Sequence, residues 1–177
     1  MKIHLSLQRV LQCMDLYILR HGKAGKATGG PDDAARALTR EGKDGITDVA
    51  AWMKRKKFRF DIIATSPLKR ARQTASIIAS VLGLEDRLTV WDELAPGGDP
   101  DTVCYNASQQ GDEAAVLVIG HEPALSMLIS TIISGEGTCS IVLAKGGLAK
   151  IGNYSFKTRP SGDLKWLVAP KLIRKME

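Results

Sequence analysis

The sequence predicts an α/β fold: a three-layer sandwich whose central sheet is mostly parallel and has helices on both faces. Short apolar runs alternate with longer segments in which apolar residues recur at helical spacing. Two of the runs, 16–19 and 115–119, are apolar enough for strands that are covered on both faces. Alternating strand and helix patterns are typical of a parallel sheet. The length of 177 residues, 44% of them hydrophobic, suits one domain with one core.

The first strand is expected to begin at Asp15, and a loop with several glycines follows it at 23–36. Thr39 can cap a helix that continues to about Lys57. The apolar face of this helix is formed by Ile46, Val49, Ala50 and Met53.

The second strand is predicted at 61–65. Ser66 is expected to cap the next helix, with Pro67 at its first position, and this helix continues to Gly83. A short strand at 88–91 comes next.

The second half of the chain repeats the alternation. A helix is predicted at 101–109, the buried strand at 115–119 leads into Pro123, and a further helix ends near Ile133. Three late strands are predicted at 140–144, 147–152 and 164–168. The last two are expected to form a hairpin around 157–162.

Residues 1–13 are predicted to be an amino-terminal extension that precedes a single domain at 14–177. The extension lacks the long apolar core and cleavage site of a secretory signal. The three cysteines are odd in number and widely spaced, which does not suit a disulfide framework or a zinc site. No apolar run is long enough to span a bilayer, so no membrane association is expected. These features favour a cytoplasmic protein.

The net charge is +6, and basic residues cluster at 54–57 and 171–175. Nucleic-acid binding is one interpretation of such clusters. Lysines at a helix end also complement the helix dipole and remain solvated, and the aromatic residues are too scattered for a stacking platform. We therefore expect no nucleic-acid partner. A positive surface can also attract an anionic substrate or an acidic protein.

Cationic and imidazole side chains follow three of the predicted strands. Arg20 and His21 end the first strand, and His121 ends the strand at 115–119. Arg70 lies near the start of the helix after 61–65. Open α/β sheets bind ligands at the carboxyl ends of their parallel strands. Two imidazoles and two guanidinium groups gathered there would suit a phosphoryl group.

Three segments resemble motifs of the histidine phosphatase superfamily, which is also called phosphoglycerate mutase-like: Arg20-His21-Gly22, Ser66-Pro67 with Arg70, Gln73 and Thr74, and Gly120-His121-Glu122-Pro123. The resemblance extends over nearly the whole chain and is strongest to the small SixA-type phosphohistidine phosphatases. It implies a phosphoglycerate mutase-like fold.

His21 is the expected catalytic nucleophile, because a neutral imidazole can attack phosphorus and form a covalent phosphohistidine. Arg20 and Arg70 are expected to bind the phosphoryl oxygens, since a guanidinium forms bidentate bonds to phosphate. His121 is expected to donate a hydrogen bond to an equatorial oxygen. A structural or capping role for either histidine is the alternative.

Three further site residues are predicted. Glu93 resembles the acid of many superfamily members, although a phosphohistidine can lose its imidazole without a strong acid, and a surface carboxylate is the alternative. Gly22 is expected to let the backbone approach the phosphate. Lys23 is expected to contact the substrate.

No metal and no cofactor are predicted. The three histidines show no local spacing that would pair them as ligands. The glycine-rich motifs that bind dinucleotides and nucleotide phosphates are missing from the sequence.

The predicted function is a metal-independent phosphatase that hydrolyses phosphohistidine in a protein. The alternatives are a phosphomonoesterase for a small phosphate ester of metabolism and a non-catalytic module that binds phosphoproteins. Short loops predict an open cleft that admits a protein side chain. Lys23, Lys26 and Arg36 of the first loop are expected to meet an acidic protein surface. The sequence predicts no oligomeric state.

Overall fold

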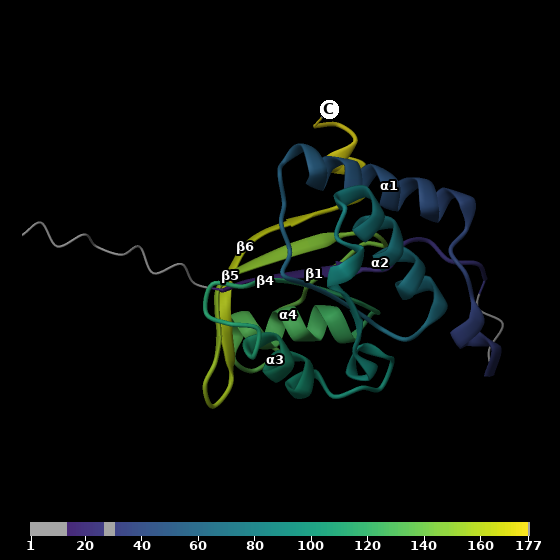
Figure 1. Cartoon of the computed structure of the whole chain (residues 1–177). Coiled ribbons are helices and arrows are strands. Elements are labelled where there is room, and N and C mark those ends of the chain that lie inside the picture. Colours follow the sequence, from purple (N-terminus) through teal and green to yellow (C-terminus); the bar gives the residue numbers. More distant parts are fainter. Residues whose placement is uncertain (1–13, 27–30, 177) are drawn as a thin grey trace, which may run out of the picture.

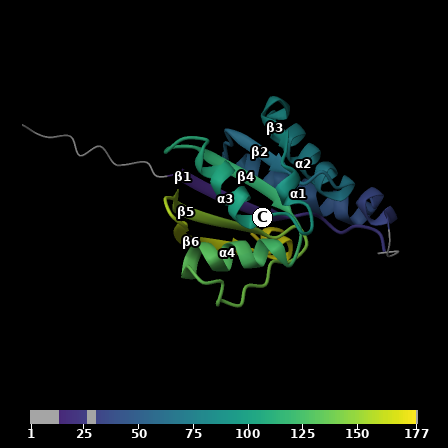
Figure 2. The same cartoon turned by 90° about the horizontal axis from the view of Figure 1, so that it is seen from below.

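The computed structural model describes residues 14–26 and 31–176. Within these ranges the chain forms one six-stranded sheet with helices on both faces (Figures 1 and 2). The predicted three-layer α/β fold is therefore confirmed. The predicted amino-terminal extension, residues 1–13, lies outside the described residues.

The sheet has the strand order β3-β2-β4-β1-β5-β6. The strands are β1 (Met14–Arg20), β2 (Ile62–Thr65), β3 (Leu88–Val90), β4 (Ala115–Gly120), β5 (Leu148–Phe156) and β6 (Pro160–Val168). Strands β1 to β4 are parallel, whereas β5 and β6 form an antiparallel hairpin beside β1. Because Arg20 pairs with Gly120 and Thr65 with Ile119, the three central strands end at the same edge of the sheet.

In the described ranges, four α-helices and three 3₁₀ turns connect the strands, and a fifth α-helix follows β6. The helices are α1 (Arg40–Arg55), α2 (Lys69–Leu82), α3 (Pro100–Ser108), α4 (Ala124–Ser134) and α5 (Pro170–Ile173). The 3₁₀ turns are η1 (Pro31–Ala35), η2 (Glu85–Arg87) and η3 (Asp92–Leu94). Helices α1 and α2 cover one face of the sheet, and α3 and α4 cover the other (Figure 1). None of the helices in the described ranges has the length and apolar character that a membrane span requires.

Two hydrophobic cores lie on the two faces of the sheet, because successive side chains of a strand point in opposite directions. On β1, Leu16 and Ile18 pack with residues of α3 and α4. Tyr17 and Leu19 point the other way and pack with residues of α1 and α2. The sheet is therefore buried on both sides, which agrees with the continuous apolar runs of β1 and β4.

Thr39 caps α1 as predicted, and its hydroxyl accepts a hydrogen bond from the amide of Gly42 at 3.0 Å. The predicted start of α2 is wrong. This helix begins at Lys69, and its capping residue is Leu68, whose side chain accepts no hydrogen bond. The hydroxyl of Ser66 accepts from the amide of Leu68, which precedes the helix, and also contacts His121.

The predicted strand at 140–144 is also wrong, because this segment forms a loop. Both edges of β1 are already paired, with β4 and β5, and both edges of β5 are paired, with β1 and β6. The segment therefore has no free strand edge beside it. Leu143 is buried and its carbonyl accepts a hydrogen bond from Arg20, while Val142 is 82% exposed. The hairpin predicted around 157–162 is confirmed, with strands longer than expected.

Candidate active site

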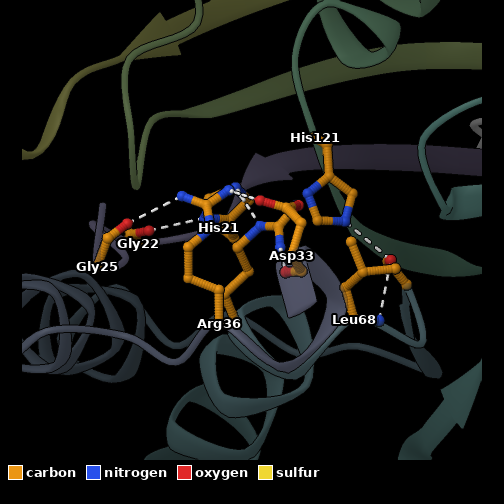
Figure 3. Close-up of polar contacts among 9 residues, drawn as sticks. His21, Gly22, Gly25, Asp33, Arg36, Leu68 and His121 are labelled. Carbon is orange, nitrogen blue, oxygen red and sulfur yellow. Dashed lines mark hydrogen bonds and ion pairs between the residues drawn. The ribbon is translucent and has the colours of Figure 1, made fainter. Parts of the chain in front are cut away.

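The two histidines of the predicted site lie side by side at the carboxyl edge of the sheet. His21 follows the last residue of β1, and His121 follows the last residue of β4. The parallel register continues beyond the strands, because the His21 amide donates to the carbonyl of Gly120 at 3.2 Å. The imidazole centroids are 4.9 Å apart with an interplanar angle of 57°, and Figure 3 shows both rings at one polar cluster.

The contacts of His21 fix the position of its ring proton. Nδ1 lies 2.7 Å from the carbonyl oxygen of Gly22. A carbonyl can only accept, so Nδ1 of the neutral ring carries the hydrogen and Nε2 carries the lone pair. The Nε–H of Arg70 donates to Nε2 at 3.3 Å. The atom able to attack phosphorus therefore faces a guanidinium group.

His21 is neutral at physiological pH. Burial is the main cause of its lowered pKa, and the nearby cations Arg70, Arg20 and Arg36 also lower it. The hydrogen bond to the carbonyl of Gly22 opposes these effects. The pKa of His21 falls from 6.5 to about 4, so the ring has its lone pair available without a separate base.

Arg70 is 3% exposed and is held by Asp33 of η1. Its Nη1 donates to the main-chain oxygen of Asp33 at 2.8 Å, and its Nη2 lies 3.1 Å from the carboxylate oxygen Oδ2. The other carboxylate oxygen pairs with Nη2 of Arg36 at 2.9 Å. Asp33 thus occupies donors of Arg70 that could bind phosphoryl oxygens, and it links the first loop to the site (Figure 3).

Arg20 is half-buried at the end of β1. Its Nη1 donates to the carbonyl of Leu143 at 2.9 Å, which fixes the guanidinium against the loop before β5. Its Nε is buried and has no hydrogen-bond partner among the described residues. A buried donor without an acceptor is costly, so an anion that reached Nε would remove this cost.

His121 is 4% exposed, and its Nε2 lies 2.8 Å from the hydroxyl oxygen of Ser66. Ser66 accepts from the amide of Leu68 at 3.3 Å and can donate its own hydrogen to Nε2. The hydrogen of His121 then resides on Nδ1, which is buried and has no partner in the described part of the chain. Burial and the proximity of His21 and Arg70 lower the pKa of His121 to about 3.

The comparisons with known proteins agree with this geometry. A family model described as the histidine phosphatase superfamily, branch 1, matches residues 16–95. The phosphohistidine phosphatase SixA of Escherichia coli strain K12 is 34% identical over 153 residues, which span 84% of this chain and 94% of SixA. The chain belongs to the histidine phosphatase superfamily. It is therefore a phosphatase, and the resemblance in its motifs is confirmed.

Two solved structures have the same fold. A structure of the protein histidine phosphatase SixA complexed with tungstate has a TM-score of 0.77 and 29% identity, and the match covers 90% of this chain and 99% of that one. A phosphoserine phosphatase from Entamoeba histolytica, in complex with phosphoserine, has a TM-score of 0.67 and 18% identity. That match covers 89% of this chain and 98% of the other, and it shows the fold alone.

Glu93, which resembles the superfamily acid, lies near His121 but outside its hydrogen bonds. It is half-buried in η3. Glu93 and His121 both line a cavity of about 20 Å³, together with apolar residues that include Leu94 and Leu125. The structure therefore brings Glu93 to the edge of the site without joining it to either histidine.

The structure shows contacts of Gly22 and Lys23 with α1, and their predicted contacts with a substrate stay predictions. A Cβ atom on Gly22 would lie 2.7 Å from Cγ1 of Ile46 and 3.0 Å from the carbonyl oxygen of Gly42. Close packing against α1 therefore requires a glycine here, and this side of Gly22 does not face an anion. Lys23 is exposed, and its ammonium group pairs with the carboxylate of Glu41.

Sequence reasoning missed the roles of three residues in this superfamily site: Asp33, Ser66 and Thr74. The Thr74 hydroxyl accepts from the amide of Gly22 at 3.1 Å and donates to the carbonyl of Arg70 at 2.8 Å. Ser66 and Thr74 belong to the second motif segment, so their place in the resemblance was an available signal. The only local signal for Asp33 was its position three residues before Arg36.

Proposed function

We propose that this phosphatase hydrolyses phosphohistidine in a protein substrate and that its intermediate is a phosphohistidine on His21. One observation carries the proposal: Nε2 of a buried, neutral His21 has its lone pair directed at Arg70. Nucleophile and cation are therefore already adjacent. The negative oxygens of a phosphoryl group would place its phosphorus close to Nε2.

In the first step, the lone pair of His21 Nε2 forms a bond to phosphorus while the bond from phosphorus to the substrate nitrogen breaks on the opposite side. The electron pair of the broken bond leaves with the substrate imidazole. In the second step, water attacks the phosphorus, the bond to Nε2 breaks, and inorganic phosphate leaves. The first step leaves the phosphoryl group on Nε2 of His21. Only the second step restores the neutral ring: the electron pair of the P–Nε2 bond returns to Nε2, and the proton that the attacking water loses passes to solvent.

Three groups would stabilise the equatorial oxygens. The Nε–H of Arg20 and the Nδ1–H of His121 are both buried donors without partners among the described residues. Arg70 would exchange its contacts with Asp33 for contacts with the phosphoryl oxygens. Preorganised donors of this kind stabilise the transition state more than they would in water.

The leaving group determines how much acid catalysis is needed. The imidazole that leaves a phosphohistidine can carry its own proton, whereas an ester oxygen requires a donor. Glu93 is the proposed donor for substrates that need one, because it shares a cavity with His121. The weak connection of Glu93 to the histidines therefore supports the phosphohistidine substrate over a phosphate ester.

The relatives support the same assignment. SixA is named a phosphohistidine phosphatase, and the structure of a SixA was solved with tungstate, a tetrahedral oxyanion like phosphate. We also infer that residues 14–177 act as one catalytic domain, because every strand in the described ranges belongs to a single sheet. A protein that begins at Met14 is expected to retain full activity.

The test compares the purified protein on a histidine-phosphorylated protein, a phosphoserine peptide and a panel of sugar phosphates, each with and without EDTA. The phosphohistidine protein should give the highest kcat/KM, and EDTA should not change it. Brief reaction with labelled substrate should trap a phosphoenzyme that is labile in acid and stable in alkali. A tenfold preference for a sugar phosphate would assign the protein as a metabolite phosphatase instead.

A further inference from the structure

A groove lies beside the catalytic edge, between the first turns of α1, the loop at 144–146 and α5. Its volume is about 390 Å³. Figure 1 shows the chain's carboxyl-terminal segment lying next to α1, which gives the groove one of its walls. The wall and rim carry one carboxylate, that of Glu41, and the cationic side chains of Lys23, Lys145, Lys171 and Arg174. The groove therefore has an excess of positive charge.

The floor of this basic groove is apolar. Ile46 of α1 and the segment Ala169-Pro170 line it. Gly42 and Gly45 bring no side chain to the α1 wall. A Cβ atom on Gly45 would lie 3.6 Å from Nη2 of Arg174, so even a small side chain would contact the cation there. The groove thus combines an apolar floor with a cationic rim, which is typical of a protein interface.

The groove is continuous with the residues that hold the nucleophile. Gly22 and Lys23, which line it, directly follow His21 in the sequence. On the opposite wall, the amide of Gly146 donates to the carbonyl oxygens of Arg20 at 3.0 Å and His21 at 3.2 Å. Both walls of the groove are thus joined to the main chain of His21, and we expect residues that flank a bound phosphohistidine to reach it.

The four cations differ in how they are neutralised. Lys23 is paired with Glu41, and Arg174 is paired with Asp48 at 2.7 Å. Lys145 and Lys171 are exposed, and neither forms an ion pair with a described residue. These two ammonium groups therefore supply positive charge that no carboxylate of the described chain compensates.

Two of the first-loop cations that were expected to meet an acidic protein surface are already engaged within the chain. Arg36 was expected to meet an acidic partner, but it is half-buried, with its guanidinium between the Asp33 carboxylate and the carbonyl of Gly25. Lys23 is also engaged, with Glu41. Lys26 is exposed and forms no ion pair with a described residue, so it remains a free cation of the first loop. Among the cations that line the groove, Lys145 and Lys171 are the two without an ion pair to a described residue.

We propose that the groove binds an acidic surface segment of the phosphoprotein substrate, so that Lys145 and Lys171 select the protein whose phosphohistidine enters the site. This inference rests on the proposed function. Small-molecule pockets fix their ligands with a few convergent, buried polar groups. The cations of the groove are exposed and spread along its rim, an arrangement that fits carboxylates displayed along a peptide or protein surface.

The test uses two phosphohistidine peptides of equal length that are phosphorylated with phosphoramidate. One has four Asp or Glu residues beside the histidine, and the other has Asn and Gln at the same positions. The variant is Lys145→Glu/Lys171→Glu. The matched control is Lys54→Glu/Lys157→Glu, which changes the net charge equally at two exposed lysines outside the groove.

The wild type should have at least a fivefold higher kcat/KM for the acidic peptide at low salt, and the preference should disappear at about 0.5 M salt because exposed charges are then screened. The groove variant should lose the preference, and its kcat/KM for the neutral peptide should stay within twofold. The control variant should keep the preference. An acidic preference equal in the groove and control variants would overturn the proposal.

Binding separates this inference from the proposed function. The unphosphorylated acidic peptide, carrying a fluorophore, should bind the wild type and the control in an anisotropy titration and bind the groove variant at least fivefold more weakly. If both phosphopeptides resist hydrolysis while this binding pattern holds, the proposed substrate is wrong and the groove remains an acidic-peptide site. Equal binding by all three proteins would refute the groove even if phosphohistidine is hydrolysed.

Discussion

The Nε–H of Arg70 points at the Nε2 lone pair of His21, and the two atoms lie 3.3 Å apart. This contact stabilises the neutral ring, because a protonated Nε2 could not accept from a guanidinium. It also places the positive charge where the oxygens of a phosphoryl group on Nε2 would lie. The same arginine thus adds to the effect of burial in keeping His21 unprotonated, and under the proposed mechanism it can neutralise the phosphoryl group during the reaction.

His21→Ala should lower kcat by about four orders of magnitude or more, as removal of a covalent nucleophile generally does. The variant loses the attacking nitrogen but keeps the arginines, so it should still fold and bind tungstate. Steady-state turnover and the yield of trapped phosphoenzyme are the measurements. Retained label, or activity above a tenth of wild type, would show that another residue is the nucleophile.

Arg70→Lys should reduce kcat/KM by about 100-fold, because lysine keeps the charge but cannot donate to His21 and to two oxygens of Asp33 together. Arg72→Lys is the matched control, since Arg72 is exposed on the same helix. Kinetics should be combined with thermal melting. Equal activity of both variants would mean that the several donors of the Arg70 guanidinium have no part in catalysis.

The positions of His21, Arg70 and His121 could be predicted because each follows a strand of the parallel sheet, and parallel strands end at a common edge. The strand pattern therefore located the two histidines without long-range information, whereas the choice of Arg70 among neighbouring basic residues also depended on the resemblance to the superfamily's second motif. Asp33 was not predicted, because its role depends on a loop that returns to α2, 37 residues later in the chain. No local pattern specifies such a contact.

The errors have the same origin. The segment at 140–144 has apolar residues suited to a strand, but the sheet has no free edge there. Ser66 before a proline is a common capping pattern, yet the helix begins only at Lys69, and the Ser66 hydroxyl contacts His121, 55 residues away, as well as the amide of Leu68. In both cases a tertiary contact replaced the structure that the local sequence favoured.

Asp33→Asn should tighten the binding of tungstate by roughly three- to tenfold. The carboxylate lies on Arg70 and Arg36 and competes with an incoming oxyanion for their donors. Removing its charge raises the positive potential of the site, and the amide oxygen can still accept from a guanidinium. Titration calorimetry measures the change. Weaker tungstate binding would indicate that the carboxylate serves chiefly to orient the arginines.

Ser66→Ala should lower kcat about tenfold with little effect on KM, because Ser66 holds the hydrogen of His121 on Nδ1. Without the hydroxyl, the ring can place its hydrogen on Nε2, where it cannot reach a ligand near Nδ1. The ¹⁵N chemical shifts of the His121 ring report the tautomer directly. A normal kcat together with an altered tautomer would show that the Nδ1 hydrogen of His121 does not stabilise the phosphoryl group.

The folded protein is expected to be less stable in mild acid, because His21 and His121 take up protons more readily in the unfolded chain. The pKa of His21 is about 4 in the folded protein, against 6.5 for an unperturbed histidine, and burial is the main cause. Between these two values the unfolded chain binds more protons than the folded protein does. The stability contributed by neutral His21 is therefore complete above pH 6.5 and declines as the pH falls toward 4.

His121 affects stability in the same direction, because its pKa is lowered to about 3 in the folded protein. Its contribution extends the loss of folding stability to lower pH. Proton NMR of the imidazole C–H resonances should show both rings titrating below pH 5, with assignments taken from His21→Gln and His121→Gln. Urea unfolding of the wild type should give a lower midpoint at pH 5 than at pH 7. If the NMR titrations instead gave a pKa near 6.5 for both rings, the site would be solvated. His21 would then need a partner to accept its proton before it could attack phosphorus.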